Sequence, residues 1–459
     1  MDYENLTNNL QQNIEKFKSY VNGDRSYNVI SRYMLDIANY HGYRVLGINN
    51  SYYIEKGVYP KAVLHLNIDG ESDLEKLSLT YGENPVVSGD KNLNLIDSCA
   101  LIASLLDLST RDFDVLLTNN NIQNDNKSYL GLKDLLRTSN IINLNLRQSK
   151  CIADEFSALI LSNVRVPLER ADQEYPGKTF RLSLSNLMGG HTSEDLDKVR
   201  LNSIKTIISF FRRLKSKVDM RMVGFKGGDR YDNIPNFASI DFRINEDYQN
   251  DLFDIFNLYQ SEFIEKNLKY EPDMHITLEE IEGIDDFSIS DVSFDRLASF
   301  VELVPSGAFS VDQMSKDLIS SINLSTVRTF EEFINLVIVY RSLSDDPMRD
   351  MLEKTHTAAK IASSEIISKL QIPRWENSDD SLTEMFRKIY YQMTGEELSV
   401  IKTQYSLDSS VIFRDLNVKI ISLGVEYKQG EDDLYHTKLS DISLVANMID
   451  EVISQIDFY

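Results

Sequence analysis

The chain has 459 residues, of which 42% are hydrophobic and 26% are charged, and it carries a net charge of −23. This length predicts two domains, because a single hydrophobic core rarely grows so large. The negative charge argues against nucleic acid and against an anionic membrane surface as partners, since both require clustered Lys and Arg side chains.

The two cysteines and the N-terminal sequence bear on the cellular compartment. Cys99 and Cys151 form neither a CxxC motif nor a framework of disulfides. The segment MDYENLTNNLQQN lacks the basic and apolar regions of a signal peptide. No apolar run approaches the roughly 20 residues that span a bilayer. We therefore expect a reduced, cytoplasmic protein.

The first 150 residues alternate between helical and strand-like patterns. Apolar residues recur at helical spacing over 6–20 and again over 30–41. Strand-like runs follow at 44–48, 52–56, 62–68, 113–118 and 141–146, with a helical stretch at 98–108. Strands that alternate with helices predict an α/β domain with a mostly parallel central sheet.

From about residue 178 the pattern changes to that of an α+β domain. Strand-like and helical segments follow in the order β-α-β-β-α-β, with helices expected over 193–216 and 247–267. This order resembles a ferredoxin-like sandwich. Two strand-like runs at 320–327 and 333–342 extend it, and a helix is expected over 345–370. No internal sequence repeat is evident.

The segment QIPRWENSDDS, residues 371–381, is typical of a linker that leads back into the first domain. After it, a helix, a strand at 418–424 and a final helix at 441–456 can complete the α/β domain. The predicted division is an α/β domain of residues 1–178 and 378–459 with residues 179–377 inserted into it.

Three segments carry a family resemblance: GGHTSEDLDKVRLN (189–202), GGDRYDNIPNFA (227–238) and YHTKLSD (435–441). Their order and spacing are similar to those of the aminoacyl-histidine (Xaa-His) dipeptidases in the zinc aminoacylase and carboxypeptidase clan. SSINL at 320 and Arg-Ser at 341 also have counterparts there, so the resemblance runs nearly end to end. It implies a peptidase-like α/β domain interrupted by an α+β ferredoxin-like lid, and a homodimer formed through that lid.

The same resemblance implies a site with two zinc ions, held by His and carboxylate ligands, and a Glu as general base. The strand VLHLNID (63–69) places Asn67 at the His ligand and Asp69 at the Asp that follows it. If His65 is the ligand instead, Asn67 replaces the Asp. In either alignment an amide, which binds zinc poorly, stands at a ligand position.

The remaining positions of the implied zinc site are altered as well. Ile96 stands at the bridging Asp with Asp97 beside it, and Asn121 and Ile122 stand where two Glu are expected. Asn145 replaces a further carboxylate. His436 is the one ligand that the resemblance retains, and Asp69 is the one retained catalytic candidate. No bound cofactor is therefore expected, although the family binds zinc.

Other residues are candidates for ligand binding, namely His191, Asp97 and Arg341. In the family, a lid His at the position of His191 lies near the substrate, but a turn-capping role is an equal alternative here. His65 and His436 also have simpler interpretations, as a buried polar residue with satisfied hydrogen bonds and as a surface residue.

Three functional hypotheses follow. The first is a non-catalytic homologue of the Xaa-His dipeptidases that binds a peptide or a partner protein. The second is an active dipeptidase with an altered or single-metal site built from His65, Asp69, Asp97 and His436. The third is a metal-independent hydrolase that uses Cys99. The geometry of the ligand positions distinguishes the first two hypotheses.

Overall fold

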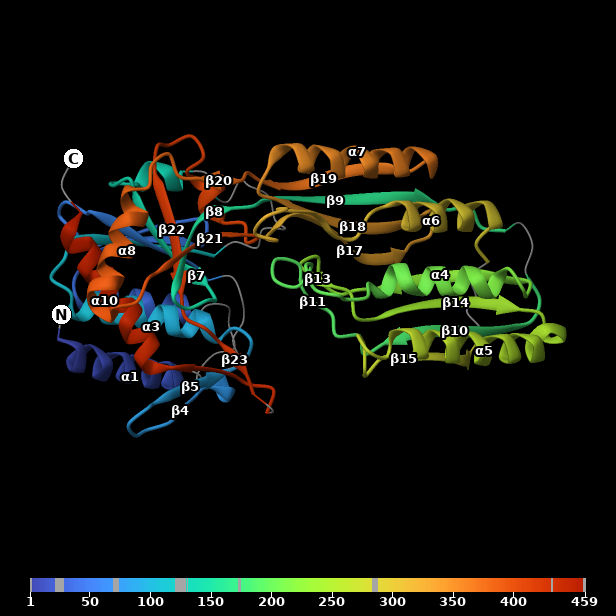
Figure 1. The fold of residues 1–459 in the computed structure, drawn as a ribbon, viewed down its shortest axis with the longest axis horizontal. Helices are drawn as coiled ribbons and strands as arrows, with labels where there is room; N and C mark the ends of the chain where they lie inside the picture. Colours follow the sequence, from blue (N-terminus) through green and yellow to red (C-terminus); the bar gives the residue numbers. More distant parts are fainter. Residues whose placement is uncertain are drawn as a thin grey trace. The chain divides into compact units, whose positions relative to one another are not determined.

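The computed structural model describes residues 2–20, 29–68, 74–119, 129, 131–171, 175–282, 288–430 and 432–456. The chain divides into two compact units (Figure 1). Unit 1 comprises Met1–Phe156, Trp375–Lys402 and Leu407–Tyr459, and unit 2 comprises Ser157–Arg374 and Thr403–Ser406. The second unit is thus inserted into the first.

The boundaries of the inserted unit differ from the predicted ones. Residues 157–178, predicted to lie in the peptidase-like domain, lie in unit 2, because strand β9 (Ala158–Pro167) pairs there with β18 (Phe333–Ser342) and β19 (Glu365–Ile372). The chain then returns to unit 2 for the short segment Thr403–Ser406. Both differences depend on backbone pairing between segments that are far apart in the sequence, and local sequence patterns contain no information about such pairing.

Unit 1 is built on a mixed sheet, nine-stranded in the described residues, with the order β1-β2-β6-β3-β7-β22-β8-β20 and with β21 paired to β8. Its central strands β6, β3, β7 and β22 run parallel, and the outer pairings are antiparallel. The strands are β1 (Arg44–Ile48), β2 (Ser51–Glu55), β3 (Ala62–Asn67), β6 (Phe113–Thr118), β7 (Asn140–Leu146), β8 (Cys151–Phe156), β20 (Trp375–Glu376), β21 (Ser399–Thr403) and β22 (Lys419–Gly424).

Five helices of unit 1 pack against one another and against this sheet to form one apolar core. They are α1 (Tyr3–Tyr20), α2 (Val29–Tyr40), α3 (Leu93–Leu108), α8 (Ser381–Thr394) and α10 (Leu439–Gln455). The short helix α9 (Asp408–Ile412) and the 3-10 turns η1 (Leu74–Lys76) and η4 (Leu132–Leu135) also belong to unit 1. A small second sheet has the order β23-β24-β5-β4. Its strands are β4 (Ser78–Leu79), β5 (Val86–Gly89), β23 (Lys428–Gln429) and β24 (Tyr435–Lys438).

Unit 2 is built on an antiparallel sheet with the order β15-β10-β14-β12-β17-β18-β9-β19, and β16 pairs with β17. The further strands are β10 (Lys178–Ser185), β11 (Gly190–His191), β12 (Met220–Gly227), β13 (Asn233–Ile234), β14 (Ala238–Ile244), β15 (His275–Ile281), β16 (Gly307–Val311) and β17 (Leu318–Thr329). Helices α4 (Ser203–Lys215), α5 (Gln249–Asn267), α6 (Asp291–Leu303) and α7 (Asp345–Ile361) cover one face of the sheet (Figure 1), and the 3-10 turn η5 (Glu246–Tyr248) precedes α5.

The topology of unit 2 repeats itself. The order β10-α4-β12-β14-α5-β15 is the predicted ferredoxin-like order, and its strands lie side by side as β15-β10-β14-β12. The segments β9, α6, β17, β18, α7 and β19 have the same order and the same arrangement, β19-β9-β18-β17. One ferredoxin-like module is therefore inserted into another. The two meet where β12 pairs with β17.

Two helix predictions in unit 2 were wrong in extent. The helix expected over 193–216 begins at Ser203, because Asn202 caps it by accepting hydrogen bonds from two backbone N–H groups of its first turn. The helix expected over 345–370 ends at Ile361, and 365–372 forms β19. Ser363 adopts a positive φ of 52° just after α7, in keeping with a chain reversal at that point.

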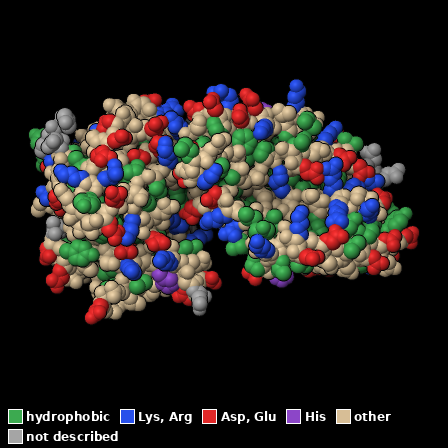
Figure 2. All heavy atoms as spheres, viewed as in Figure 1, with side chains coloured by type: hydrophobic (Ala, Val, Ile, Leu, Met, Phe, Trp, Pro, Cys, Tyr) green, Lys and Arg blue, Asp and Glu red, His purple; other side chains and the backbone are tan. Residues whose placement is uncertain are grey.

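None of the helices that the structure describes combines the length and the apolar character that a membrane crossing requires. Acidic and basic side chains are interspersed over the face drawn in Figure 2. An excess of acidic charge that is mixed with basic side chains favours solubility and does not by itself indicate a partner.

Candidate functional site

The first candidate site lies where the parallel strands of unit 1 end. In open α/β sheets, ligands bind beyond the carboxyl ends of the parallel strands. Strand β3 ends at Asn67, which is in register with Thr118 at the end of β6. His65 is in register with Asn143 on β7. The sheet therefore brings Asn67, His65 and Asn143 to the edge where the resemblance implies zinc ligands.

The amides of this edge bind one another. The Asn145 side chain accepts a hydrogen bond from the backbone N–H of Asn67 at 3.0 Å and donates to the carbonyl of Asn67 at 3.0 Å. It also accepts from the Asn143 amide at 2.9 Å, and Ser422 Oγ donates to Asn143 Oδ1 at 2.7 Å. These groups satisfy one another, as buried polar groups must.

His65 is completely buried in the middle of this network. Its Nδ1 lies 3.2 Å from the Asn143 amide nitrogen and 2.7 Å from Ser409 Oγ. Because the amide nitrogen can only donate, Nδ1 is the acceptor and the ring proton is on Nε2. That nitrogen lies 3.1 Å from Thr118 Oγ1 and 3.6 Å from Asp408 Oδ2. Both ring nitrogens are therefore used by neighbouring protein groups.

Asp408, a residue that the sequence analysis missed, completes the network. Its side chain is 3% exposed and accepts from Thr118 Oγ1 and from the backbone N–H of Ser409. Burial alone would raise the pKa of Asp408, but His65, Thr118 and the Ser409 N–H together lower it below its ordinary value. The segment Leu407-Asp408-Ser409 has no motif that could have identified this role.

The position of the implied bridging Asp lies inside helix α3. Ile96 is 1% exposed and packs in the core of unit 1. Asp97 is equally buried, and neither of its carboxylate oxygens makes a hydrogen bond of ordinary geometry within the described residues. Burial raises the pKa of Asp97 well above its ordinary value, and the nearby Tyr427 hydroxyl offsets only part of this effect. Burial likewise raises the pKa of the Cys99 thiol, so Cys99 is unsuited to act as a nucleophile.

His436 lies on β24 in the small sheet of unit 1. Its Nδ1 lies 2.8 Å from Ser88 Oγ and its Nε2 lies 3.1 Å from Asp432 Oδ1. Contact with His436 lowers the pKa of Asp432 below its ordinary value. The ring is thus held by side chains of its own sheet and of the turn before it.

Among the described residues, the side chains at the implied ligand positions do not form a zinc-binding group. A zinc site requires three or four His, Cys or carboxylate ligands around one point, and the described residues contain no such group of three. The carboxyl ends of β3 and β7 present amides instead, and the one histidine among them already uses both ring nitrogens. Asp69, Asn121 and Ile122 lie outside the described residues.

The second candidate site lies in unit 2 around His191. Gly189 and Gly190 have φ angles of +59° and +134°, and a Cβ on Gly190 would lie 2.5 Å from the Asp195 carboxylate. This close approach lets Asp195 accept from the backbone N–H of His191 at 2.8 Å. The GGH motif therefore forms a tight turn, in which His191 Nδ1 also accepts from the backbone N–H of Ser193 at 3.2 Å. The His191 ring, about one third exposed, remains partly accessible.

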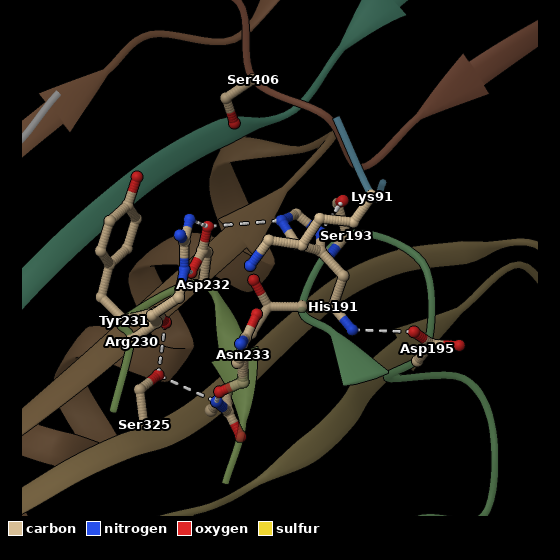
Figure 3. Close-up of polar contacts among 12 residues, drawn as sticks. Lys91, His191, Ser193, Asp195, Arg230, Tyr231, Asp232, Asn233, Ser325 and Ser406 are labelled. Atoms are coloured by element: carbon tan, nitrogen blue, oxygen red, sulfur yellow. Dashed lines mark hydrogen bonds and ion pairs between the residues drawn. The ribbon is translucent and has the colours of Figure 1, made fainter. Parts of the chain in front are cut away.

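Asp232 connects His191 to Arg230 (Figure 3). The guanidinium of Arg230 donates to both carboxylate oxygens of Asp232, at 2.8 and 2.6 Å, and His191 Nε2 lies 3.6 Å from Asp232 Oδ2. Burial would raise the pKa of Asp232, but Arg230 and His191 together hold it well below its ordinary value. The His191 ring also stacks on Tyr405, with centroids 6.0 Å apart.

Arg341 lies on β18 next to this cluster and is only 4% exposed. Its guanidinium donates to Thr192 Oγ1 at 3.2 Å, to the carbonyl of Gln404 at 2.9 Å and to Ser406 Oγ at 3.2 Å. All three acceptors are neutral, and Arg341 makes no ion pair in the described part of the chain. Burial lowers the pKa of this guanidinium to about 10, although Tyr231 and Asp232 act in the opposite direction. A buried cation whose hydrogen bonds all go to neutral acceptors is suited to an anionic ligand.

None of the protein-family models matches this chain. A stretch of 218 residues is 21% identical to the cytosol non-specific dipeptidase of Escherichia coli, and it covers 47% of this chain. The chain is a homologue of that dipeptidase. The match spans 45% of the relative's own length.

Solved structures show the fold more completely. The aminoacylhistidine dipeptidase of Vibrio alginolyticus matches with a TM-score of 0.68 and 20% identity, over 98% of this chain and 97% of that one. A tripeptidase of Staphylococcus aureus matches at 0.57 and 10% over 99% of each chain. An M20 family metallo-carboxypeptidase of Sulfolobus solfataricus matches at 0.50 and 12% over 99% of each. The predicted fold class is therefore confirmed, because the chain shares the mixed α/β fold of M20 peptidases.

Proposed function

We propose that this chain is a non-catalytic homologue of the zinc dipeptidases and that it binds a peptide or a peptide segment of a partner protein. One observation carries the proposal. In unit 1, the ends of β3 and β7 hold a closed network of amides, hydroxyls and one imidazole in place of metal ligands. A ligand set converted to neutral groups no longer binds zinc tightly.

The chemistry of this network supports the loss of catalysis. In family members, a zinc-bound water attacks the peptide carbonyl and a Glu acts as general base, and loss of such a base costs orders of magnitude in rate. In unit 1, Asn145 binds the Asn67 backbone, and His65 binds Ser409 and Thr118. These interactions stabilise the folded chain but provide no activated water.

The cluster in unit 2 supports ligand binding. Arg341 is a buried cation that donates its hydrogen bonds to neutral acceptors, namely Thr192 Oγ1, the Gln404 carbonyl and Ser406 Oγ. A carboxylate of a peptide would supply the missing negative charge, with charge-assisted hydrogen bonds about twice as strong as neutral ones. His191, joined to Arg341 through the adjacent Thr192, would contribute a second polar contact. We therefore propose a peptide ligand with a free carboxylate.

The first experiment is to measure bound metal and hydrolysis on the same preparation. The purified chain is incubated with excess zinc, desalted and analysed by plasma mass spectrometry, and then assayed with alanyl-histidine. The Vibrio aminoacylhistidine dipeptidase, treated in parallel, serves as positive control. We expect essentially no retained zinc and no hydrolysis above background. Two zinc ions per chain with hydrolysis of alanyl-histidine would establish the alternative, an active Xaa-His dipeptidase.

Two further properties belong to this proposal. The name of the Escherichia coli relative places that protein in the cytosol, and we propose the same location for this chain.

We also propose a homodimer formed through unit 2. Strands β12 and β17 pair with each other within the chain, so the contact would use other surfaces of that unit. Sedimentation of the purified chain tests the dimer directly.

A further inference from the structure

Strand β17 carries a row of small polar side chains on the sheet face opposite the helices. Ser321, Asn323 and Ser325 alternate along this strand with the core residues Ile322 and Leu324, and all are completely buried. Buried polar side chains require partners, and their partners show what a buried polar row is for.

Asn323 uses its whole amide. Its Nδ2 donates to the carbonyl of Asn233 at 2.9 Å and to Ser325 Oγ at 2.9 Å. Its Oδ1 accepts from the side chain of Asn202 at 3.2 Å. Asn202 is also the N-cap of α4. Asn323 thus connects the start of α4 to the loop that follows β12.

Ser325 holds the same loop two residues earlier. Its Oγ donates to the carbonyl of Tyr231 at 2.6 Å, as Figure 3 shows. The carbonyls of residues 231 and 233 are therefore both fixed, and Asp232 lies between them. A peptide segment held on both sides of one residue has little freedom to turn that residue's side chain.

Asp232 passes this constraint on to His191. Its carbonyl accepts from the backbone N–H of Thr192 at 2.7 Å, and β11 pairs with β13 so that His191 faces Asn233. Its carboxylate lies 3.6 Å from the His191 ring. Strand β17 is therefore linked to the partly exposed imidazole of His191 by an unbroken series of hydrogen bonds and close contacts.

We infer that Asn323 and Ser325 are positioning residues that hold the Arg230–Asp232 loop and, through Asp232, set the orientation of the His191 ring. The residues act on the site without reaching a ligand themselves. Only the consequence for peptide binding rests on the proposed function.

The strand offers a matched pair of variants for the test. Ser325→Ala removes a hydroxyl that makes two hydrogen bonds. Ser321→Ala removes a hydroxyl on the same strand and the same face that has no partner among the described residues. Hydrogen exchange of the peptides covering 188–195 and 229–236 reports loop opening without any ligand. The aromatic resonance of His191, identified by its loss in His191→Gln, reports the ring's position over Tyr405.

In Ser325→Ala, we expect exchange in these two peptides to rise about tenfold and the His191 resonance to move, with β10 and β15 unchanged. Ser321→Ala should match the wild type in every readout. Asn323→Ala should open the same two peptides. The inference is overturned by unchanged exchange in both peptides, or by a rise throughout unit 2, which would indicate a general stabilising role.

Affinity for alanyl-histidine, measured by calorimetry on the same variants, separates this inference from the proposed function. If only Ser325→Ala and Asn323→Ala bind the dipeptide more weakly, the result supports both the positioning role and the proposed function. Local opening in a chain whose wild type does not bind the dipeptide supports the positioning role and argues against a dipeptide ligand. Unchanged exchange in a chain that binds the dipeptide overturns the positioning role alone.

Discussion

The polar cluster around His65 in unit 1 and the polar cluster around Arg341 in unit 2 differ in the buried charge that they hold, a carboxylate in the first and a guanidinium in the second. Around His65, the hydrogen bonds are made between groups of unit 1, and the carboxylate of Asp408 accepts from Thr118 and from a backbone N–H. Around Arg341, a buried cation meets neutral oxygens only. The first cluster is complete within the chain, whereas the second is suited to an additional anion.

Under the proposed function, this difference would explain how a hydrolase scaffold loses its reaction and retains recognition. Replacement of metal ligands by amides would leave buried polar groups that cost free energy unless they find partners. In unit 1 they bind one another, so the altered site stabilises the fold. In unit 2 the buried Arg341 guanidinium is hydrogen-bonded to neutral groups and has the Asp232 carboxylate only as a more distant opposite charge, so the proposed anionic ligand would lower the free-energy cost of burying it. Four variants test this comparison.

The largest effect is expected for His65→Ala. The change removes the imidazole ring that contacts the Thr118 hydroxyl and the Asp408 carboxylate, and it leaves that buried carboxylate with fewer partners. We expect the free energy of unfolding to fall by about 3–5 kcal/mol, measured by urea denaturation. The exposed His356→Ala serves as control and should change it by less than about 0.5 kcal/mol. A loss below about 1 kcal/mol for His65→Ala would show that the network contributes little.

Gly228→Ala tests the seam between the two modules of unit 2. Gly228 has a φ of +64°, and a Cβ there would lie 1.9 Å from the Ser325 carbonyl oxygen. We expect a loss of about 2–4 kcal/mol from the left-handed backbone and the forced shift. Gly224→Ala, whose Cβ would meet nothing within 4 Å, is the matched control. Equal melting temperatures for the two variants would contradict the importance of this close approach.

Arg341→Met separates stability from binding. Because a buried unpaired charge is replaced by an apolar side chain, we expect the free energy of unfolding to stay constant or rise. Affinity for alanyl-histidine should fall about 100-fold, since a charge-assisted pair is lost. Calorimetry and thermal melts provide the two measurements. Arg165→Met, an exposed site on the same sheet, should leave both unchanged. Strong destabilisation without loss of affinity would assign Arg341 a purely structural role.

Asp97→Asn should have the smallest effect, a gain in stability near pH 7. The folded-state pKa of Asp97 is raised, so the unfolded chain releases this proton first and stability falls as pH rises above about 4. Removing the carboxyl should add about 1 kcal/mol or more at pH 7, and the gain should vanish near pH 4. Asp273→Asn, on the surface, should show no such pH dependence. A stability loss at pH 7 would indicate that the Asp97 carboxylate has a partner.

Local patterns predicted much of the fold because local physics determines those parts. The strand-like runs predicted at 62–68, 113–118 and 141–146 appear as β3, β6 and β7. The expected helix over 193–216 was too long, because apolar spacing alone does not show that Asn202 caps the helix. The segment 365–370 was predicted as helix but pairs with β9. Pairing with a distant strand overrides local helical preference.

The candidate sites show the same limit. The amides at Asn67 and Asn145 were recognisable from their positions in motifs, and the structure brings them into direct contact. Asp408 was not recognisable, since nothing in its own segment differs from an ordinary helix start. Arg230 and Tyr405 were missed for the same reason. When the role of a residue depends on a contact partner, the sequence reveals that role only if the partner lies nearby in the sequence.

The amino-acid sequence by itself determined the alternation of helices and strands, the resemblance to zinc dipeptidases and the presence of amides at positions where that resemblance implies metal ligands, because each is a property of neighbouring residues. Only the tertiary structure decided that Ser409 would bind His65 across 344 residues. It also decided that two ferredoxin-like modules without an evident sequence repeat would join at β12 and β17. Such contacts depend on which strands become neighbours, and that is fixed by packing and hydrogen bonding of the whole chain.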